Sequence, residues 1–282
     1  MDKKMSMYPE NRSEQEDPEV LCKSWDWHVR RKLAWSIDTS ETILAILSRD
    51  AVQWVREAVA GNSRTPDRVL ARLVEDSSGF VRAAVALNSH ATGEMLEVLA
   101  GDEMVDYDST LNKNRYLVRE AVARSPNVTP PVLAFLARDP DEHVRVAAAS
   151  NAGLQPESMN KMVRDVSWEV RNNIAKNPST PDELLVYLSA DRIMDVRATI
   201  AQNPRTPAAA LAAMAQDKSW EVREALARNS NLDERILTEL ATHWSWMVRM
   251  AVAENPNTPD ETIKRLAGDQ DQSVQKAALA RC

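Results

Sequence analysis

The sequence of 282 residues predicts an all-α fold, an α-solenoid of nine and a half 26-residue repeats, each made of two short helices. Three observations support this fold class. A Val-Arg dipeptide recurs at a fixed interval, other residue types keep the same register, and apolar residues inside each interval have helical spacing. Self-similarity at a fixed period of about 20 to 50 residues is the signature of a repeat architecture.

Every interval between successive Val-Arg arginines is 26 residues except one. The exception is 37 residues long, because it contains an 11-residue insertion at about 103–113. The repeats therefore cover about residues 25–282, and a polar segment, residues 1–24, precedes them. The arginines of this column are Arg30, Arg56, Arg82, Arg119, Arg145, Arg171, Arg197, Arg223 and Arg249.

The first helix of a repeat follows from residues 167–177. Val170 and Ile174 are four residues apart and so lie on one helical face. Ala175 stands four residues after Arg171, and every full repeat has an alanine there, which indicates a close approach of two helices. Asn177 is expected to end this helix in the left-handed conformation.

The second helix is expected to begin at the Thr-Pro sequence that follows. Thr180 is predicted as the N-cap, Pro181 as the first helical residue, and Glu183 as the residue that closes a capping box. Leu185 and Leu188 provide the apolar face of this helix. Neither helix can bury its apolar face alone, so stacking of repeats is expected to fold the chain.

The pattern VRMAVAENPNTPDETIKRLAGD, residues 248–269, resembles the repeats of the bacterial leucine-rich repeat variant family, within the HEAT-like group of helical repeats. The resemblance extends over about residues 25–282. It implies a right-handed superhelix of short helices and a role in interaction rather than catalysis. Some members carry a cysteine-rich iron–sulfur module before the repeats, but residues 1–24 contain only Cys22, so no cluster is expected here.

Composition restricts the class of partner and the location. The 35 basic and 42 acidic residues give a net charge of -7, which disfavours binding to nucleic acid or an anionic membrane. Cys22 and Cys282 lie far apart in the sequence, as expected for a cytoplasmic protein in a reducing compartment. No apolar run approaches the ~20 residues of a membrane span, and the first residues lack a signal peptide. Residues 1–24 are expected to be partly disordered.

The arginine column is predicted to be a structural ladder, from Arg56 to Arg249. Asp stands six residues before the arginine in most repeats, as in Asp165 and Asp191, so Asp–Arg pairs can link neighbouring repeats. Asp139, in the same column, is also expected to cap the N-terminus of its helix. The alternative is that the arginines bind phosphates or an acidic peptide.

Two further columns are candidates for binding a partner. Trp168, Met194, Trp220 and Trp246 stand three residues before the arginine, so each tryptophan ring is expected to lie against its own arginine as a cation–π pair. These four residues are hereafter the aromatic stripe. They are candidates because Trp, Met and Arg are enriched in interface cores. The alternative is that the rings only fill the seam between repeats.

The second candidate column lies sixteen residues after the arginine, on the second helix. It changes from repeat to repeat, and its predicted anchors are Phe135 and Tyr187, on a helix expected to line the concave side. Ordinary variation of exposed residues is the alternative. The insertion carries Glu103, Asp106 and Asp108, and is either a tolerated loop or a recognition element.

Catalytic motifs are not found. His28, His90, His143 and His243 have no metal-ligand spacing, and glycine-rich phosphate loops are excluded by a total of 6 glycines. No catalytic residue, cofactor or metal is predicted. The sequence therefore predicts a non-enzymatic scaffold that binds another protein or peptide. The alternatives are a HEAT-like protein that binds nucleic-acid backbones and an enzyme whose site is assembled from distant repeats.

Overall fold

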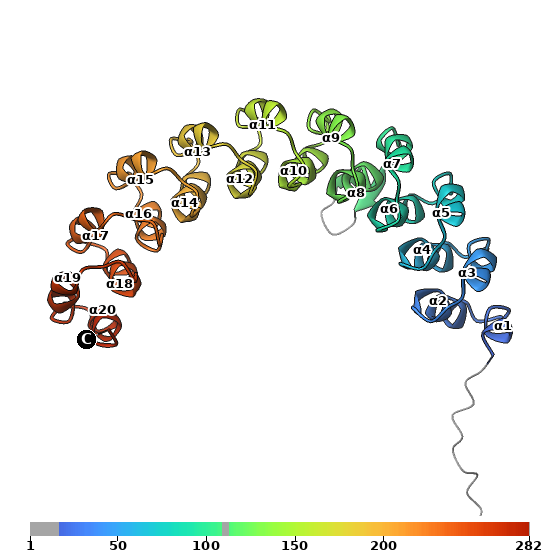
Figure 1. Cartoon of the computed structure of the whole chain (residues 1–282), viewed down its shortest axis with the longest axis horizontal. Helices are drawn as coiled ribbons and strands as arrows, with labels where there is room; N and C mark the ends of the chain where they lie inside the picture. The colour runs from blue at the N-terminus through green and yellow to red at the C-terminus, as the bar shows by residue number, and fades with distance from the viewer. Residues whose placement is uncertain (1–16, 109–112, 282) are drawn as a thin grey trace, which may run out of the picture. The chain divides into compact units, whose positions relative to one another are not determined.

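The computed structural model describes residues 17–108 and 113–281, which form 20 helices and one short hairpin. The chain divides between Leu99 and Ala100 into two compact units. In both units, first and second helices of the repeats alternate along the chain, as Figure 1 shows. The predicted all-α repeat fold is thereby confirmed, with first helices of mostly nine residues and second helices of mostly seven.

The N-terminal unit begins with a short helix, α1, that contributes to packing beside the first repeat. The predicted disorder of residues 1–24 falls mostly on residues 1–16, which lie outside the described residues. Cys22 directly follows α1 and is a buried free thiol. The helices of this unit are α1 (Pro18–Leu21), α2 (Trp27–Trp35), α3 (Glu41–Leu47), α4 (Gln53–Gly61), α5 (Asp67–Leu73), α6 (Gly79–Leu87) and α7 (Gly93–Ala100), the last ending at the unit boundary.

The C-terminal unit begins with the insertion, in which β1 (Asp106–Asp108) and β2 (Lys113–Arg115) pair antiparallel. The acidic side chains of Asp106 and Asp108 lie outside the described residues. The helices that follow are α8 (Leu117–Arg124), α9 (Pro130–Leu136), α10 (Glu142–Ser150), α11 (Pro156–Met162), α12 (Trp168–Lys176), α13 (Asp182–Leu188), α14 (Met194–Gln202), α15 (Ala208–Met214), α16 (Trp220–Ala227), α17 (Glu234–Leu240), α18 (Trp246–Glu254), α19 (Asp260–Leu266) and α20 (Gln272–Leu279).

First helices of neighbouring repeats pack directly on one another, because the alanine column lets their backbones approach. Every column alanine, from Ala34 to Ala253, is completely buried. Second helices of neighbouring repeats make few contacts with each other and pack instead on the first helices. Within the C-terminal unit, the first helices form the inner row of a curved double layer and the second helices form the outer row (Figure 1). A larger residue at an alanine position would force the inner row apart.

The asparagine column joins each repeat to the one before it. The Asn177 side-chain Nδ2 donates to the carbonyl oxygens of Ala149, at 2.8 Å, and Asn151, at 2.9 Å. The Asn177 Oδ1 accepts from the backbone N–H of Ser179 at 2.9 Å. The same bond to an alanine of the preceding repeat is made by Asn62, Asn88, Asn151, Asn203, Asn229 and Asn255.

The prediction that Asn177 adopts the left-handed conformation is wrong. Its φ of -66° and ψ of 126° are extended, and it ends α12 by bonding to another repeat. The capping role predicted for Thr180 is also wrong. α13 begins at Asp182, its N-cap is Pro181 without a side-chain bond, and the buried Thr180 hydroxyl donates to the Ile174 carbonyl at 2.6 Å. That carbonyl lies in the last turn of α12, where acceptors lack helical partners.

No helix within the described residues has the length and apolar character required to cross a bilayer.

The asparagine column is expected to be a main source of stability. Asn177→Ala would leave the buried Ala149 carbonyl oxygen without a donor and remove one of two donors from the Asn151 carbonyl, which should lower the free energy of unfolding by about 1–3 kcal/mol. Asn160→Ala, on the exposed surface of α11, is the matched control and should change it by less than about 0.5 kcal/mol. Urea unfolding followed by circular dichroism measures both. Equal effects of the two substitutions would contradict the stabilising role of the asparagine column.

Candidate protein-binding surface

An ion-pair ladder runs along the loops that connect each second helix to the next first helix. Arg171 Nε and Nη2 donate to both carboxylate oxygens of Asp191, at 2.6 and 2.9 Å, and Nη1 donates to the Asp165 carbonyl at 2.8 Å. Two nearly parallel bonds of this kind are a strong, geometrically specific interaction. The same pairing joins Arg30 to Asp50, Arg56 to Asp76, Arg119 to Asp139, Arg145 to Asp165, Arg197 to Asp217 and Arg249 to Asp269.

Each column aspartate also holds the turn that precedes the next helix. Asp191 Oδ1 accepts from the backbone N–H of Ile193 at 2.8 Å, and Asp139 Oδ1 accepts from that of Asp141, also at 2.8 Å. The prediction that Asp139 caps its helix is wrong. α10 begins at Glu142, and its N-cap is Asp141, whose carboxylate accepts from the backbone N–H of His143. The column aspartate thus stands two residues before the N-cap, and its carboxylate is directed to the arginine.

The pairing favours the ionised form of the aspartates in the ladder. Burial alone would raise the pKa of the Asp191 carboxyl, but hydrogen bonds from the Arg171 side chain and the Ile193 backbone N–H lower it below its ordinary value. The same balance lowers the pKa of Asp217 beside Arg197. Both side chains of the Arg171–Asp191 pair are nearly inaccessible to solvent. A paired, buried guanidinium is poorly placed to bind an external phosphate.

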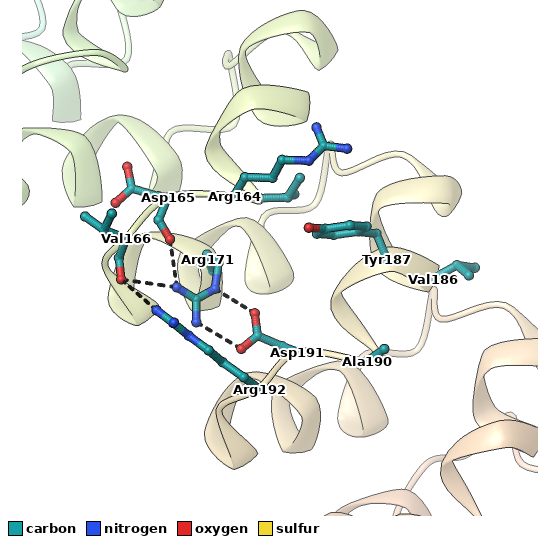
Figure 2. A pocket seen from close by; sticks show the side chains of 10 residues that line it. Arg164, Asp165, Val166, Arg171, Val186, Tyr187, Ala190, Asp191 and Arg192 are labelled. Carbon is teal, nitrogen blue, oxygen red and sulfur yellow. Dashed lines mark hydrogen bonds and ion pairs between the residues drawn. The ribbon is translucent and has the colours of Figure 1, made fainter.

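A hollow of about 670 Å³ opens beside the Arg171–Asp191 pair (Figure 2). The guanidinium of Arg164 lies over the Tyr187 ring, 5.2 Å from its centroid. Val166 is 82% exposed and Tyr187 is 47% exposed, so this hollow presents apolar and aromatic surface to solvent. Arg192 closes one side by donating to the Val166 carbonyl at 3.5 Å. We call this the Tyr187 hollow.

Tyr187 lines this hollow, whereas Phe135 does not. Phe135 lies on α9, is strongly exposed, and does not line the hollow. Both residues lie on second helices, which form the outer row of the C-terminal unit (Figure 1). The expectation that the second helices line the concave side is therefore wrong. The reason is that the alanine column brings the first helices closer together than the second helices.

The aromatic stripe lies on the other row. Trp168, Met194, Trp220 and Trp246 are the first residues of α12, α14, α16 and α18. Trp168 and Trp246 are each 39% exposed, while Met194 and Trp220 are half-buried. The stripe and the Tyr187 hollow are thus separate surfaces of one unit.

The predicted cation–π pairs between these tryptophans and their arginines are not formed among the described residues. The column does contain one such pair, in which the Arg119 guanidinium lies 3.7 Å from the Tyr116 ring centroid. Tyr116 is the N-cap of α8 and has non-helical backbone angles, whereas the tryptophans are already the first helical residues. The backbone position of the ring, and not the spacing alone, decides whether it meets the arginine.

Sequence reasoning missed one position of this surface, the residue directly after the column aspartate. Val166 and Trp244 occupy it and are 82% and 77% exposed. In other repeats the same position holds Arg192, Lys218 or Gln270. A large apolar residue at a position that is small or polar in most other repeats was the available signal.

No cluster of three or more His, Cys, Asp or Glu residues suited to a metal ion occurs in the described part of the chain.

The repeated two-helix unit and its inter-repeat ladders define an α-solenoid repeat protein. The resemblance to the leucine-rich repeat variant family is confirmed, since the model of the leucine rich repeat variant matches residues 194–219 and 246–271. Both matches begin at residues of the aromatic stripe, Met194 and Trp246.

Of three similar solved structures, the first supports the fold. A leucine-rich repeat variant with a novel repetitive structural motif has 24% sequence identity and a TM-score of 0.58, with 88% of this chain and 89% of that chain covered. An engineered protein has 17% identity and a TM-score of 0.36, covering 93% and 96% of the two chains. A designed armadillo repeat protein has 18% identity and a TM-score of 0.18, covering 93% and 97%. Among curated proteins, none matches this sequence significantly.

The ion-pair ladder is expected to stabilise the stack. Arg171→Ala would leave the buried Asp191 carboxylate without its partner and should lower the free energy of unfolding by about 3–5 kcal/mol. Arg164→Ala removes an exposed guanidinium from the same repeat and should cost less than about 1 kcal/mol. Thermal and urea unfolding compare the two variants. An unchanged unfolding curve for Arg171→Ala would overturn the structural role of the ladder.

The same pairs predict the acid sensitivity of the fold. Because the folded-state pKa of Asp191 and Asp217 is lowered, their ionised forms stabilise the protein above the unfolded-state pKa of about 4. This contribution is lost as the pH falls through the lowered folded-state values. The urea midpoint should change little between about pH 7 and 5 and decrease below about pH 4. The decrease should be smaller in Asp191→Asn, and parallel curves for the two proteins would contradict this assignment.

Proposed function

We propose that this chain is a non-enzymatic cytoplasmic scaffold that binds another protein or peptide through its C-terminal unit. The observation that carries the proposal is the Tyr187 hollow, which combines exposed Val166 and Tyr187 with the guanidinium groups of Arg164 and Arg192. Aromatic, aliphatic and arginine side chains around a concavity are the composition of interface hot spots. Burial of an exposed apolar side chain such as Val166 against a partner contributes favourably to the free energy of binding.

The aromatic stripe is proposed as a second contact surface of the same unit. Trp168 and Trp246 keep a substantial part of their rings in solvent, although they start helices that pack within the stack. Large amphipathic rings of this kind contribute strongly to binding when a partner buries them.

Binding along a nucleic-acid backbone is less well supported. Most of the column arginines are paired with a carboxylate of the ladder, and the net charge of the chain is -7. Phosphate contacts require unpaired cations and give a steep dependence on salt concentration.

The test uses the full chain as bait to capture partners from the cytoplasm of the source organism. The double variant Val166→Ser/Tyr187→Ala removes the apolar surface of the hollow, and Phe135→Ala removes an exposed aromatic outside it. Loss of two hot-spot side chains should weaken binding of a captured partner by more than about tenfold. Phe135→Ala should retain it.

Isothermal titration calorimetry with the captured protein gives the affinities, and circular dichroism verifies that all three proteins are equally folded. Equal affinities for wild type and the double variant would show that the hollow is not the interface. Selective loss in Phe135→Ala would place the contact on the outer face of α9 instead.

A further inference from the structure

The ion-pair ladder is interrupted at one repeat of the C-terminal unit. Arg223, on α16, is a column arginine, but the position of its aspartate partner is occupied by His243. Arg223 forms no ion pair within the part of the chain that the structure describes. The acidic residues of its own helix are engaged elsewhere, because Glu224 pairs with Arg228 at 2.7 Å and Glu221 accepts from the Ser219 hydroxyl.

His243 keeps one role of the missing aspartate and loses the other. Its ring Nδ1 accepts from the backbone N–H of Ser245 at 3.1 Å, as the aspartate oxygen does in the other turns. That bond makes Nδ1 the unprotonated nitrogen of a neutral ring. Burial, and then the positive charges of Arg223 and Arg249, lower the pKa of His243. The turn is therefore preserved, while the carboxylate that would neutralise Arg223 is absent.

The Arg223 guanidinium is oriented differently from those of the paired arginines. Its Nε donates to the Asp217 carbonyl at 2.7 Å. In the paired repeats, the equivalent carbonyl is bound by Nη1, as between Arg171 and Asp165 or between Arg197 and Asp191. Both terminal nitrogens of Arg223 thus lack a hydrogen bond to any described residue, and neither is among the fully buried atoms without a partner. The two terminal nitrogens therefore remain available as donors to a group that arrives from solvent.

Three tryptophans lie near this interruption in the sequence, and one of them contacts His243. Trp244 follows His243, is 77% exposed, and its ring centroid lies 5.3 Å from that of the histidine. Trp220 precedes Arg223 by three residues and so shares its helical face. The exposed Trp246 begins the next first helix. A cation in a repeat that also carries exposed tryptophans suits an acidic residue that has apolar neighbours.

We propose that Arg223 and the surrounding tryptophans form a binding site for a carboxylate, supplied by an aspartate or glutamate of a partner peptide with apolar flanking residues. The incoming carboxylate takes over the role of Asp191, Asp217 or Asp269 in other repeats, but it accepts from Nη1 and Nη2 of Arg223, because Nε is already bound to the Asp217 carbonyl. Planar carboxylate geometry matches the guanidinium fork through two bonds. This inference rests on the proposed function, because it names the chemistry of the partner, but it uses residues outside the Tyr187 hollow.

The test uses a defined probe, the capped peptide Gly-Leu-Asp-Leu-Gly, and its counterpart with asparagine in place of aspartate. The full chain, labelled with ¹⁵N, is titrated with each peptide, and the arginine Nε–Hε resonances are followed, with Arg223→Lys identifying the resonance of Arg223. The aspartate peptide should give a saturable shift of the Arg223 resonance. The asparagine peptide should bind at least tenfold more weakly.

The decisive variant is His243→Asp, which supplies the missing carboxylate from within the chain. It should raise the urea midpoint and weaken binding of the aspartate peptide at least tenfold. Because the Arg223 resonance itself changes in this variant, its affinity is measured by fluorescence anisotropy of a fluorescein-labelled peptide. Thr242→Asp adds the same charge one residue earlier, at an exposed position, and should retain binding within about twofold of wild type.

Equal binding of the two peptides by wild type, or unchanged binding in His243→Asp, would overturn the proposal. Binding of an oligothymidine that is lost in His243→Asp, without binding of the aspartate peptide, would also overturn it and assign the site to phosphate. A defined probe keeps this outcome separate from that of the capture experiment. Failure of the capture experiment would reject the Tyr187 hollow, whereas failure of the peptide titration would reject the carboxylate site alone.

Discussion

The close approach of successive first helices is the constraint on which the rest of the structure depends. Helices of seven to nine residues are too short to be stable alone in water, so each must be held by its neighbours. The alanine column removes side-chain volume between the inner helices. The asparagine amide then reaches carbonyls at the end of the preceding first helix, where the helical pattern of donors runs out. At the end of the chain, Arg281 takes the asparagine position and donates to the carbonyls of Ala253 and Asn255.

The ion-pair ladder links the same repeats through the loops that join each second helix to the next first helix. It also separates positions that stabilise the stack from positions that can vary. Once an arginine and an aspartate link neighbouring repeats, the residue after the aspartate is not needed for that link and can vary. It is Val166 in one repeat, Arg192 in another and Trp244 in a third. The surface beside a uniform ladder therefore differs from repeat to repeat. This arrangement lets a regular stack present a specific binding surface, and a change in one ladder residue, such as His243, alters that surface without disturbing the turn.

Local capping rules were the least reliable part of the sequence interpretation. Thr180 and Asp139 both stand where a capping residue is expected, yet neither caps a helix. Thr180 donates to Ile174, and Asp139 accepts from the backbone N–H of Asp141 and pairs with Arg119. In each case the side chain is used for a bond other than the N-cap bond that the spacing suggests. Spacing in the sequence gives the candidates for a bond, but the packed neighbours decide which bond forms.

The sequence by itself determined the number and length of the repeats, the identity of the buried columns, and the pairing of arginine with aspartate. These properties depend on residue spacing, which a periodic chain must repeat in space. The tertiary structure decided which helix row lies on the inner side of the C-terminal unit, because curvature depends on the relative separation of the two rows. It also decided that Tyr187 lines a hollow with Arg164 while Phe135 does not. Those positions are equivalent in the repeat, but the side chains around them differ, as Arg164, Val166 and Arg192 beside Tyr187 show.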